Sequence, residues 1–282
     1  MKHILLDTLF ESLNLLPFLL ITFLIIEFIE HKASKKSIKM LTKTKKYGPI
    51  IGGILGATPQ CGLGVMATNL YATNIITIGT LIAIYLSTSD EMLPVLISEG
   101  MPFSKILIIL LIKVIIGIVC GFIIDFIFRK KNKHTKIDVQ ELCENEHCHC
   151  ENSIIKSSLI HTLKTFSFIF LVSFVLHIFI HEIGEDKISN LLLNGNIFTP
   201  FLSSIIGLIP NCAGSVVITE LYVNNVISFG SMLAGLLTGS GISILVLFKA
   251  NSDLKDNMLI LGTVYIIGVI FGILFNLVGI TI

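Results

Sequence analysis

One segment of this chain occurs twice, 151 residues apart, and each copy carries a proline, a polar residue and a cysteine in succession. The copies run from Gly56 to Asn74 and from Gly207 to Asn225, and they align without a gap. Positions with the same residue in both copies include, in first-copy numbers, Pro59, Cys61, Thr68, Leu70, Tyr71, Asn74 and, just beyond, Gly79. Shared composition explains matched leucines, but not aligned proline, cysteine and tyrosine. The chain therefore contains an internal duplication.

The hydrophobic content places this duplication in a membrane. Of the 282 residues, 53% are hydrophobic and 14% are charged, and the mean hydropathy is +0.88. Because a span needs about 20 apolar residues, the apolar runs predict several crossings, at 13–28, 106–128, 167–180, 226–248 and 258–282. A lysine-rich loop without a cleavage site follows the first run, which we expect to be retained. We predict an all-α polytopic membrane protein with the lipid bilayer as partner and no nucleic-acid partner.

The same offset extends over nearly the whole chain and divides it into three parts. Pro49 matches Pro200, and Gly117 and Gly121 match Gly268 and Gly272. We therefore predict three parts: a membrane repeat at 1–131, a Cys/His-rich linker at 132–155 and a second membrane repeat at 156–282.

Loop charge predicts opposite orientations for the two repeats. Lysines crowd residues 32–46, and lysine and arginine crowd residues 129–156, so both segments are expected in the cytoplasm. The loop at 182–199, which corresponds to the first of these, is acidic and is expected outside. These assignments predict inverted-topology repeats in a bacterial plasma membrane, with both chain termini external.

Parity then requires a hairpin in each repeat. Residues 75–97 and 104–128 supply two crossings between the cytoplasmic loops, so residues 49–73 must enter and leave on one side. We predict a re-entrant hairpin with its tip at Pro59-Gln60-Cys61, and a twin at 200–224 with its tip at Pro210-Asn211-Cys212. Each repeat would then be one span, one hairpin and two spans, or about ten helical segments in all.

The hairpin tips are the candidate transport site. Proline breaks the helix, and the next helix then begins with free amides that favour thiolate on a cysteine. Glutamine and asparagine at the tips offer amide oxygens. The candidate residues for substrate or metal contact are Gln60, Cys61, Thr68, Asn69, Asn74, Asp90, Glu91, Asn211, Cys212, Thr219, Glu220 and Asn225. A cysteine without this context, Cys120, is expected to serve packing.

Three carboxylates lie in apolar surroundings and are candidate proton carriers. Glu220 stands where the first repeat has Asn69, and Asp90 and Glu91 are expected inside a span because the hydrophobic pattern resumes after them. The alternative for this acidic pair is an interfacial helix end. Lys113, also within a span, either pairs with an acidic residue or extends toward the membrane surface.

Peripheral clusters add further candidate ligands. The linker contains five cysteine and histidine residues, which suit soft metal ions and suggest a sensor or delivery loop: Cys143, His147, Cys148, His149 and Cys150. Acidic and histidine residues also lie at the end of the first predicted helix of each repeat. They are either vestibule sites for a metal ion or a proton, or interfacial polar residues that end the helix: Glu27, Glu30 and His31, and His177, His181 and Glu182.

These motifs resemble those of ten-helix heavy-metal exporters, a family also described as manganese transporters or arsenic efflux proteins. The resemblance rests on Pro59-Gln60-Cys61-Gly62, Pro210-Asn211-Cys212-Ala213 and Asp90-Glu91, and it covers nearly the whole chain except the linker. The family motif has glycine where this chain has Gln60 and Asn211. The resemblance implies the architecture and the export of a metal, with manganese first.

We therefore expect a secondary transporter that exports a metal ion by alternating access, driven by H⁺ or Na⁺. No nucleotide-binding loop is present in the sequence, and neither an enzymatic activity nor a permanently bound cofactor is expected. Mn²⁺ is the first candidate, while the cysteines favour softer ions such as Zn²⁺, Cd²⁺, Fe²⁺ or As(III). The alternatives are a permease for arsenite, organoarsenicals or other small solutes, an intramembrane thiol redox enzyme, and a channel. Folds with opposed hairpins often dimerise, so a homodimer is also expected.

Overall fold

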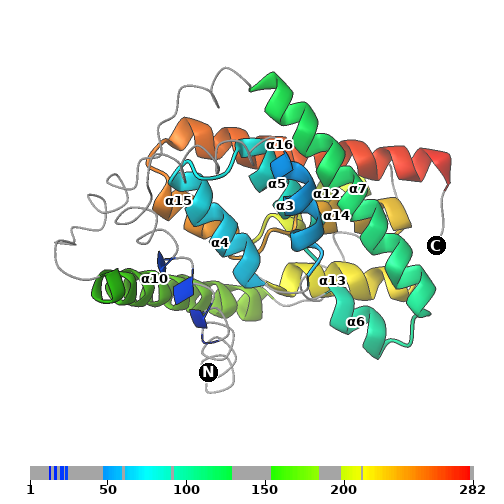
Figure 1. Cartoon of the computed structure of the whole chain (residues 1–282). Helices are drawn as coiled ribbons and strands as arrows, with labels where there is room; N and C mark the ends of the chain where they lie inside the picture. The colour runs from blue at the N-terminus through cyan, green and yellow to red at the C-terminus, as the bar shows by residue number, and fades with distance from the viewer. Residues whose placement is uncertain are drawn as a thin grey trace.

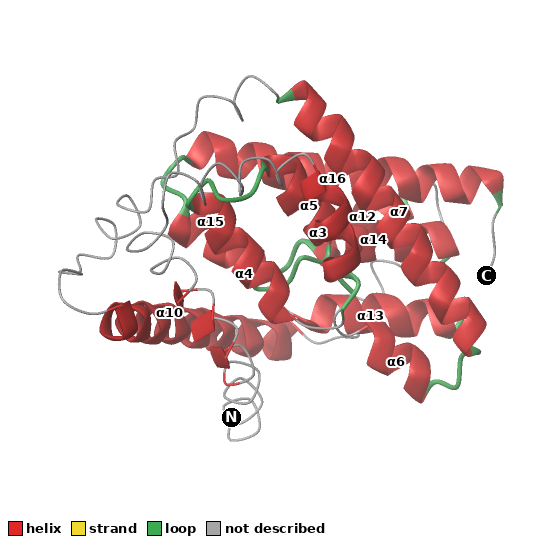
Figure 2. Ribbon diagram, viewed as in Figure 1, coloured by secondary structure: helices red, strands yellow, loops and turns green. Residues whose placement is uncertain are grey.

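The structure is a computed structural model of the whole chain, and parts of it are described. These are residues 47–58, 61–89, 92–128, 154–183, 198–210 and 212–279, with Leu13, Leu16, Pro17, Leu20, Ile21, Phe23 and Leu24. Every regular element in these ranges is a helix (Figure 2), so the predicted all-α class is confirmed.

The helices repeat with the offset seen in the sequence. The first repeat contains α3 (Gly48–Gly56), α4 (Cys61–Ala72), α5 (Ile78–Ser87), α6 (Met92–Ser98) and α7 (Phe103–Ile127). The long helix α10 (Ile154–Ile183) precedes their counterparts, which are α12 (Thr199–Gly207), α13 (Cys212–Val223), α14 (Phe229–Thr238), α15 (Ser243–Ala250) and α16 (Leu254–Val278). Four pairs have identical bounds after a shift of 151 residues, and α15 ends one residue later than its counterpart α6. Figure 1 shows their arrangement.

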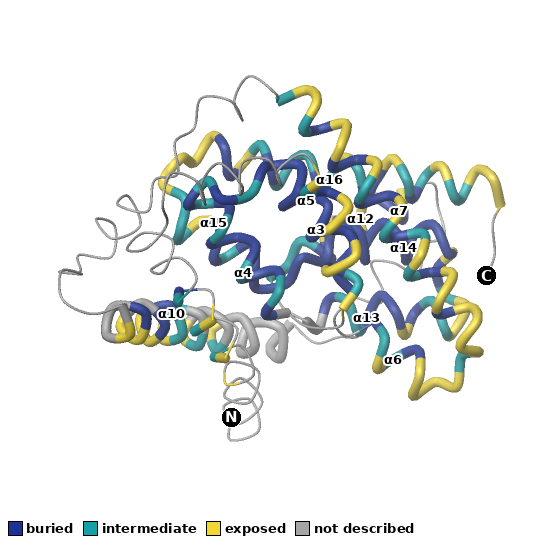
Figure 3. Tube along the Cα trace, in the orientation of Figure 1, coloured by how far each residue is buried: buried dark blue, intermediate teal, exposed yellow. Residues whose placement is uncertain are grey.

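The core is built around α5 and α14. Every residue of these two helices is buried, and α3 and α7 pack on the first as α12 and α16 pack on the second. The outer helices α7 and α16 instead have exposed positions along their length (Figure 3). Their exposed apolar side chains include Leu111, Ile115 and Ile266. A buried polar-containing centre with an exposed apolar rim is the arrangement expected when lipid surrounds the protein.

Small residues allow the core helices to approach closely. A Cβ atom on Gly121 of α7 would lie 2.6 Å from the carbonyl oxygen of Gly79 on α5. In the second repeat, a Cβ atom on Gly272 of α16 would lie 2.9 Å from the carbonyl oxygen of Gly230 on α14. Glycine at helix crossings, which lets backbones touch, is a common means of packing helices in membranes.

The starts of α5 and α14 are fixed by equivalent hydrogen bonds. Thr77 caps α5 and donates to the Asp125 carboxylate at 2.7 Å, and this carboxylate also accepts from the Gly79 amide at 2.9 Å. Ser228 caps α14 and donates to the Asn276 side chain at 2.7 Å. The two repeats therefore use the same geometry with different polar residues.

The first predicted crossing after each hairpin is two helices rather than one, which corrects the continuous spans expected at 75–97 and 226–248. The first is interrupted between Ser87 and Met92, and the second between Thr238 and Ser243. Thr88 has extended φ and ψ angles of −55° and 132°, and Gly241 has a φ of 54°. Serine, threonine and glycine offer the backbone alternatives to helical bonding, which explains why the helices stop there.

The two repeats pack against each other through their short helices. Helix α4 of the first repeat packs on α15 of the second, and α13 of the second packs on α6 of the first. Within the described ranges, four helical segments are long and apolar enough to cross a membrane: Ile78–Ser98, Phe103–Ile127, Phe229–Ala250 and Leu254–Val278. The first and third of these include the interruptions. The architecture is that of a multi-pass membrane protein with discontinuous helices.

Candidate transport site

Both predicted hairpins contain a helix break at the proline-containing motif. Helix α3 ends at Gly56 and α4 begins at Cys61, while α12 ends at Gly207 and α13 begins at Cys212. Each motif cysteine is thus the first residue of a helix, as expected from the position of the prolines. The first amides of a helix have no partner within it, so both helix starts can interact with a ligand or a polar side chain.

The interruption of each discontinuous span lies beside the hairpin of its own repeat. The Ser89 hydroxyl, just after α5, donates to the carbonyl oxygen of Ala57 at the end of α3 at 3.0 Å. At the end of α14, the Thr238 hydroxyl donates to the carbonyl oxygen of Ser204 on α12 at 2.9 Å. Two kinds of helix break therefore meet in each repeat, and side-chain hydroxyls donate to backbone carbonyl oxygens beside them.

A buried polar cluster joins the repeats where α4 meets the start of α15. The hydroxyl groups of Thr68 and Tyr85 lie 2.7 Å apart, and both lie within hydrogen-bond distance of the carbonyl oxygen of Ser243, at 3.4 and 3.3 Å. The shortest contact of the Thr68 hydroxyl with a carbonyl oxygen is to Gly64, at 2.7 Å, so its single hydrogen has more than one possible acceptor. All of these side chains are buried. The structure thus brings predicted Thr68 together with two residues that the sequence did not single out.

Asn69 is buried without a hydrogen-bond partner for its amide nitrogen. Its side chain is 2% exposed, and no oxygen accepts from Nδ2. The hydroxyl groups of Ser203 and Ser204 on α12 are the other buried unsatisfied polar groups among the described residues. A buried donor without a partner costs about 1–3 kcal/mol, so Asn69 is a candidate to contact a polar or charged ligand.

The second repeat differs at the matching positions. Thr219 is fully buried and donates to the Ser215 carbonyl on its own helix at 2.7 Å. Glu220, aligned with buried Asn69, is exposed. The predicted pair is therefore asymmetric in surroundings as well as in charge.

The matched asparagines end their helices. Asn74 and Asn225 both have a φ of 58°, in the left-handed region. The amides of Asn74 and Ile75 bond back to Tyr71 and Leu70, at 2.8 and 2.9 Å, and equivalent bonds follow α13. This geometry is the left-handed closure common at helix ends, where asparagine is favoured after glycine. Helix termination explains their match, and a role in substrate contact stays a prediction.

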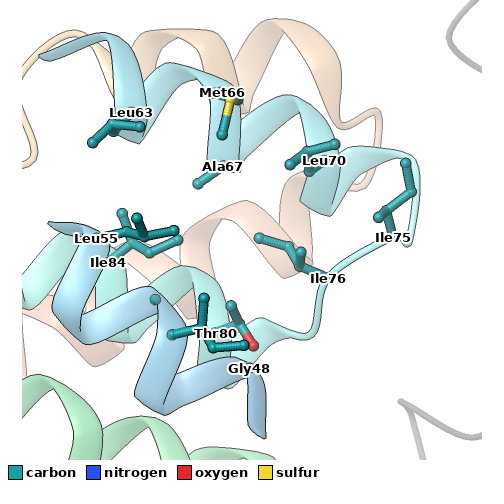
Figure 4. Close-up of a pocket in the computed structure, with 12 residues that line it drawn as sticks. Gly48, Leu55, Leu63, Met66, Ala67, Leu70, Ile75, Ile76, Thr80 and Ile84 are labelled. Carbon is teal, nitrogen blue, oxygen red and sulfur yellow. The ribbon is translucent and has the colours of Figure 1, made fainter. Parts of the chain in front are cut away.

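A cavity of about 180 Å³ separates the arms of the first hairpin. Figure 4 shows Leu63, Met66 and Leu70 of α4 across the cavity from Leu55 of α3 and Ile84 of α5. The lining is hydrocarbon apart from the Thr80 hydroxyl and the Met66 sulfur, so it does not suit a metal ion. It leaves space between the hairpin arms and α5.

Several predicted site residues lie outside the described residues or have undescribed side chains. Among them, the backbone places Cys61 and Cys212 at helix starts and His177, His181 and Glu182 in α10. The remaining predicted residues that lie outside the described ranges are Glu27, Glu30, His31, Pro59, Gln60, Asp90, Glu91, Cys143, His147, Cys148, His149, Cys150 and Asn211. Pro210 is described, just before that gap. No three His, Cys, Asp or Glu side chains in the described part could together hold a metal ion.

Sequence reasoning missed Tyr85, Ser243 and a buried carboxylate, Asp256, that accepts from Tyr71 at 2.5 Å. Tyr85 had one available signal, since a single tyrosine hydroxyl in the apolar run 78–87 needs a partner.

Repeated helix pairs, breaks in buried spans and polar groups between the repeats are features found in membrane transporters. The chain matches, over residues 5–193 and 167–281, the family described as "Putative, 10TM heavy-metal exporter", and it belongs to that family. This confirms the resemblance drawn from its motifs. Neither the curated proteins nor the solved structures contain a match to this chain.

Proposed function

We propose that this protein is a secondary active transporter that exports a metal ion from the cytoplasm of a bacterium by alternating access. The observation that carries this proposal is that α4 and α13 begin at the two motif cysteines, in a family of heavy-metal exporters. Both helix starts then present free amides and a sulfur ligand. The tip motifs, Pro59-Gln60-Cys61 and Pro210-Asn211-Cys212, form the substrate site in this proposal.

The inverted topology is supported by contacts between helix ends. Tyr71, near the end of α4, hydrogen-bonds Asp256, near the start of α16. Loop charge assigns both ends to the cytoplasmic side, since 32–46 and 129–156 carry the basic residues. The contact between α13 and α6 likewise joins two helices that lead to the outside in this topology. With this topology, the helix pairs α3–α4 and α12–α13 are re-entrant hairpins that enter from opposite sides.

Mn²⁺ is the first substrate to test, followed by Zn²⁺, Cd²⁺, Fe²⁺ and As(III). Amide oxygens at Gln60 and Asn211 suit Mn²⁺, whereas thiolates at Cys61 and Cys212 suit softer ions. The linker cluster at 143–150 would bind metal on the cytoplasmic side before transport. H⁺ or Na⁺ supplies the driving gradient in this proposal.

The transported substrate and the direction of transport can be determined in cells that lack the gene. Growth and cellular metal content should be measured across Mn, Zn, Fe, Cu, Cd and arsenite. Hypersensitivity with raised content of one metal is expected and would name the exported ion. Lowered content with unchanged sensitivity would instead reverse the direction to import, and no change for any metal would favour an organic solute or thiol redox chemistry.

The site can be tested with cysteine variants in proteoliposomes that contain a metal-sensitive dye. Cys61→Ala and Cys212→Ala are expected to lower metal flux by about tenfold or more, since each removes a ligand from the proposed site. Cys120→Ala is the matched control, because Cys120 is buried in the hydrophobic core and should leave flux within about twofold. Full flux in the Cys61/Cys212 double variant would contradict the assignment.

A further inference from the structure

A buried carboxylate ties the two repeats together. Asp256, in the first turn of α16, is 6% exposed. Its Oδ2 atom accepts two hydrogen bonds, one from the Tyr71 hydroxyl at 2.5 Å and one from the Asn251 side-chain amide at 3.0 Å. Because Tyr71 lies on α4 and Asp256 on α16, the first bond connects the hairpin of the first repeat to the last helix of the second.

The surrounding amides hold this carboxylate in place. The Asn251 amide group also donates to the Asn257 side-chain oxygen at 2.8 Å, and the Asn257 amide group donates to the Asn251 carbonyl at 2.9 Å. The backbone amide of Asp253 donates to the side-chain oxygen of Asn251 at 3.3 Å. Asn257 is fully buried. This network fixes Asn251, and with it one of the donors to Asp256.

The fold does not require these polar residues. At the equivalent positions the first repeat has Lys105 in place of Asp256 and Ile106 in place of Asn257. Lys105 is exposed, yet α7 has the same bounds as α16 after the shift and packs on α5 as α16 packs on α14. Burying an ion costs several kcal/mol even in a paired site. A carboxylate kept at this cost in only one of two like-folded repeats points to a functional role.

We infer that Asp256 is the proton-binding site that couples a proton gradient to movement of the first hairpin. This inference rests on the proposed transport function and names its coupling ion. A proton adds to a carboxylate oxygen, giving the neutral carboxyl group, and leaves again as a proton, with no other bond made or broken. Protonation replaces a charge-assisted hydrogen bond from Tyr71 with a neutral one that is about half as strong. The link between α4 and α16 therefore weakens on protonation and strengthens on release.

The donors around Asp256 oppose a metal ion at the oxygen that they contact. Tyr71 and Asn251 direct hydrogen atoms at the same carboxylate oxygen and stabilise its charge, so in this inference the proton binds the other oxygen. Of the other titratable groups on the described helices around it, Tyr85 of α5 and exposed Asp253 lie near enough to influence Tyr71. Lys249 of α15 donates to Thr165 and lies over the Phe168 ring. Helices α12 and α14 contain no ionisable side chain.

The test compares Asp256→Asn with Asp253→Asn in full-length protein reconstituted into liposomes. The first variant keeps the shape of the site but cannot exchange a proton, so it should retain metal exchange at equal concentrations. Its proton-driven flux should fall by about tenfold or more, within the range of measured coupling between sites. The exposed Asp253→Asn control should stay within about twofold. Tyr71→Phe keeps the proton site but removes the link, and should also uncouple flux. Wild-type coupling in Asp256→Asn would overturn the inference.

A second readout separates this inference from the proposed function. The infrared spectrum of the purified protein in lipid, without metal, should gain a protonated-carboxyl band on acidification that Asp256→Asn lacks. If no such difference band appears while the protein stays folded, Asp256 does not bind a proton and the inference is wrong. If the band appears but the wild-type protein moves no metal under any gradient, the proposed function fails, and coupling at Asp256 fails with it.

Discussion

The ammonium group of Lys113 donates a hydrogen bond to the carbonyl oxygen of Thr88, the C-cap residue that follows the last residue of α5. Lys113 is 1% exposed, so its side chain stays inside the protein and does not extend to the membrane surface. The carbonyl end of a helix carries partial negative charge, which a cation stabilises. The position aligned with it in the second repeat is Val264.

Replacing Lys113 with methionine should destabilise the protein. The change keeps the apolar stem and leaves the Thr88 carbonyl without its charged donor, at a cost of about 1–3 kcal/mol. Thermal unfolding in detergent measures the effect. Lys105→Met, at an exposed position on the same helix, should change stability by less than about 0.5 kcal/mol. Equal stability of the two variants would show that the Lys113 hydrogen bond contributes little.

Alanine at Gly121 or Gly272 should destabilise the helix pairs by about 1–3 kcal/mol, because the core cannot accommodate an added atom. The new Cβ atom would lie 2.6 Å from the Gly79 carbonyl oxygen in the first case and 2.6 Å from the Ala234 Cβ atom in the second. Gly262→Ala is the matched control, since nothing lies within 4 Å of its Cβ position. That variant should be unchanged or more stable by up to about 1 kcal/mol, from helix propensity. Equal thermal stability of the Gly121→Ala, Gly272→Ala and Gly262→Ala variants would refute the packing argument.

Glycine should replace Asn74 or Asn225 without loss of stability. Both residues have a φ of 58°, which glycine adopts freely, whereas alanine there should cost about 1–2 kcal/mol. Metal flux in the glycine variants decides between the two roles of these asparagines. Retained flux would assign them to helix termination alone, and lost flux in a protein of normal stability would support the predicted substrate contact.

The contact between Thr68 and Tyr85 should show measurable coupling. Thr68→Val, Tyr85→Phe and the double variant form a cycle whose interaction energy is expected at about 0.5–1.5 kcal/mol, from a net hydrogen bond between buried groups. Thr219→Val is a control, because Thr219 donates within its own helix. Additive effects in the Thr68–Tyr85 cycle would mean that the 2.7 Å contact does not stabilise the packing of α4 on α5.

Much of the fold could be predicted because helix-breaking residues occur at matched positions in both copies of the duplicated segment. Proline, glycine and cysteine at matched positions located the hairpin breaks, and the helices do begin at Cys61 and Cys212. The interruptions after Ser87 and Thr238 were not predicted, since the hydrophobic pattern resumes beyond them. Periodicity reports which residues are apolar, and a short run of serine, threonine or glycine inside a span leaves that pattern nearly intact.

The site was harder to predict because its polar contacts join distant parts of the chain. Asp256 lies in the first turn of a helix, where acidic residues commonly serve as caps, and nothing local indicates that Tyr71 reaches it. Asn74 and Asn225 show a different limit. Their match predicted ligand contact, and the structure adds a second reason for it, since a left-handed helix end favours asparagine through backbone geometry.

The exchange of short helices between the repeats has a consequence for how the protein is made. Helix α4 packs on α15, which the ribosome adds only near the end of the chain, while α13 packs on α6 from the first half. Helix α4 therefore lacks one of its packing partners until late in synthesis, although α5 of its own repeat is already present, whereas α6 is already made when α13 is added. The addition of α15 is then the step that completes the packing around α4.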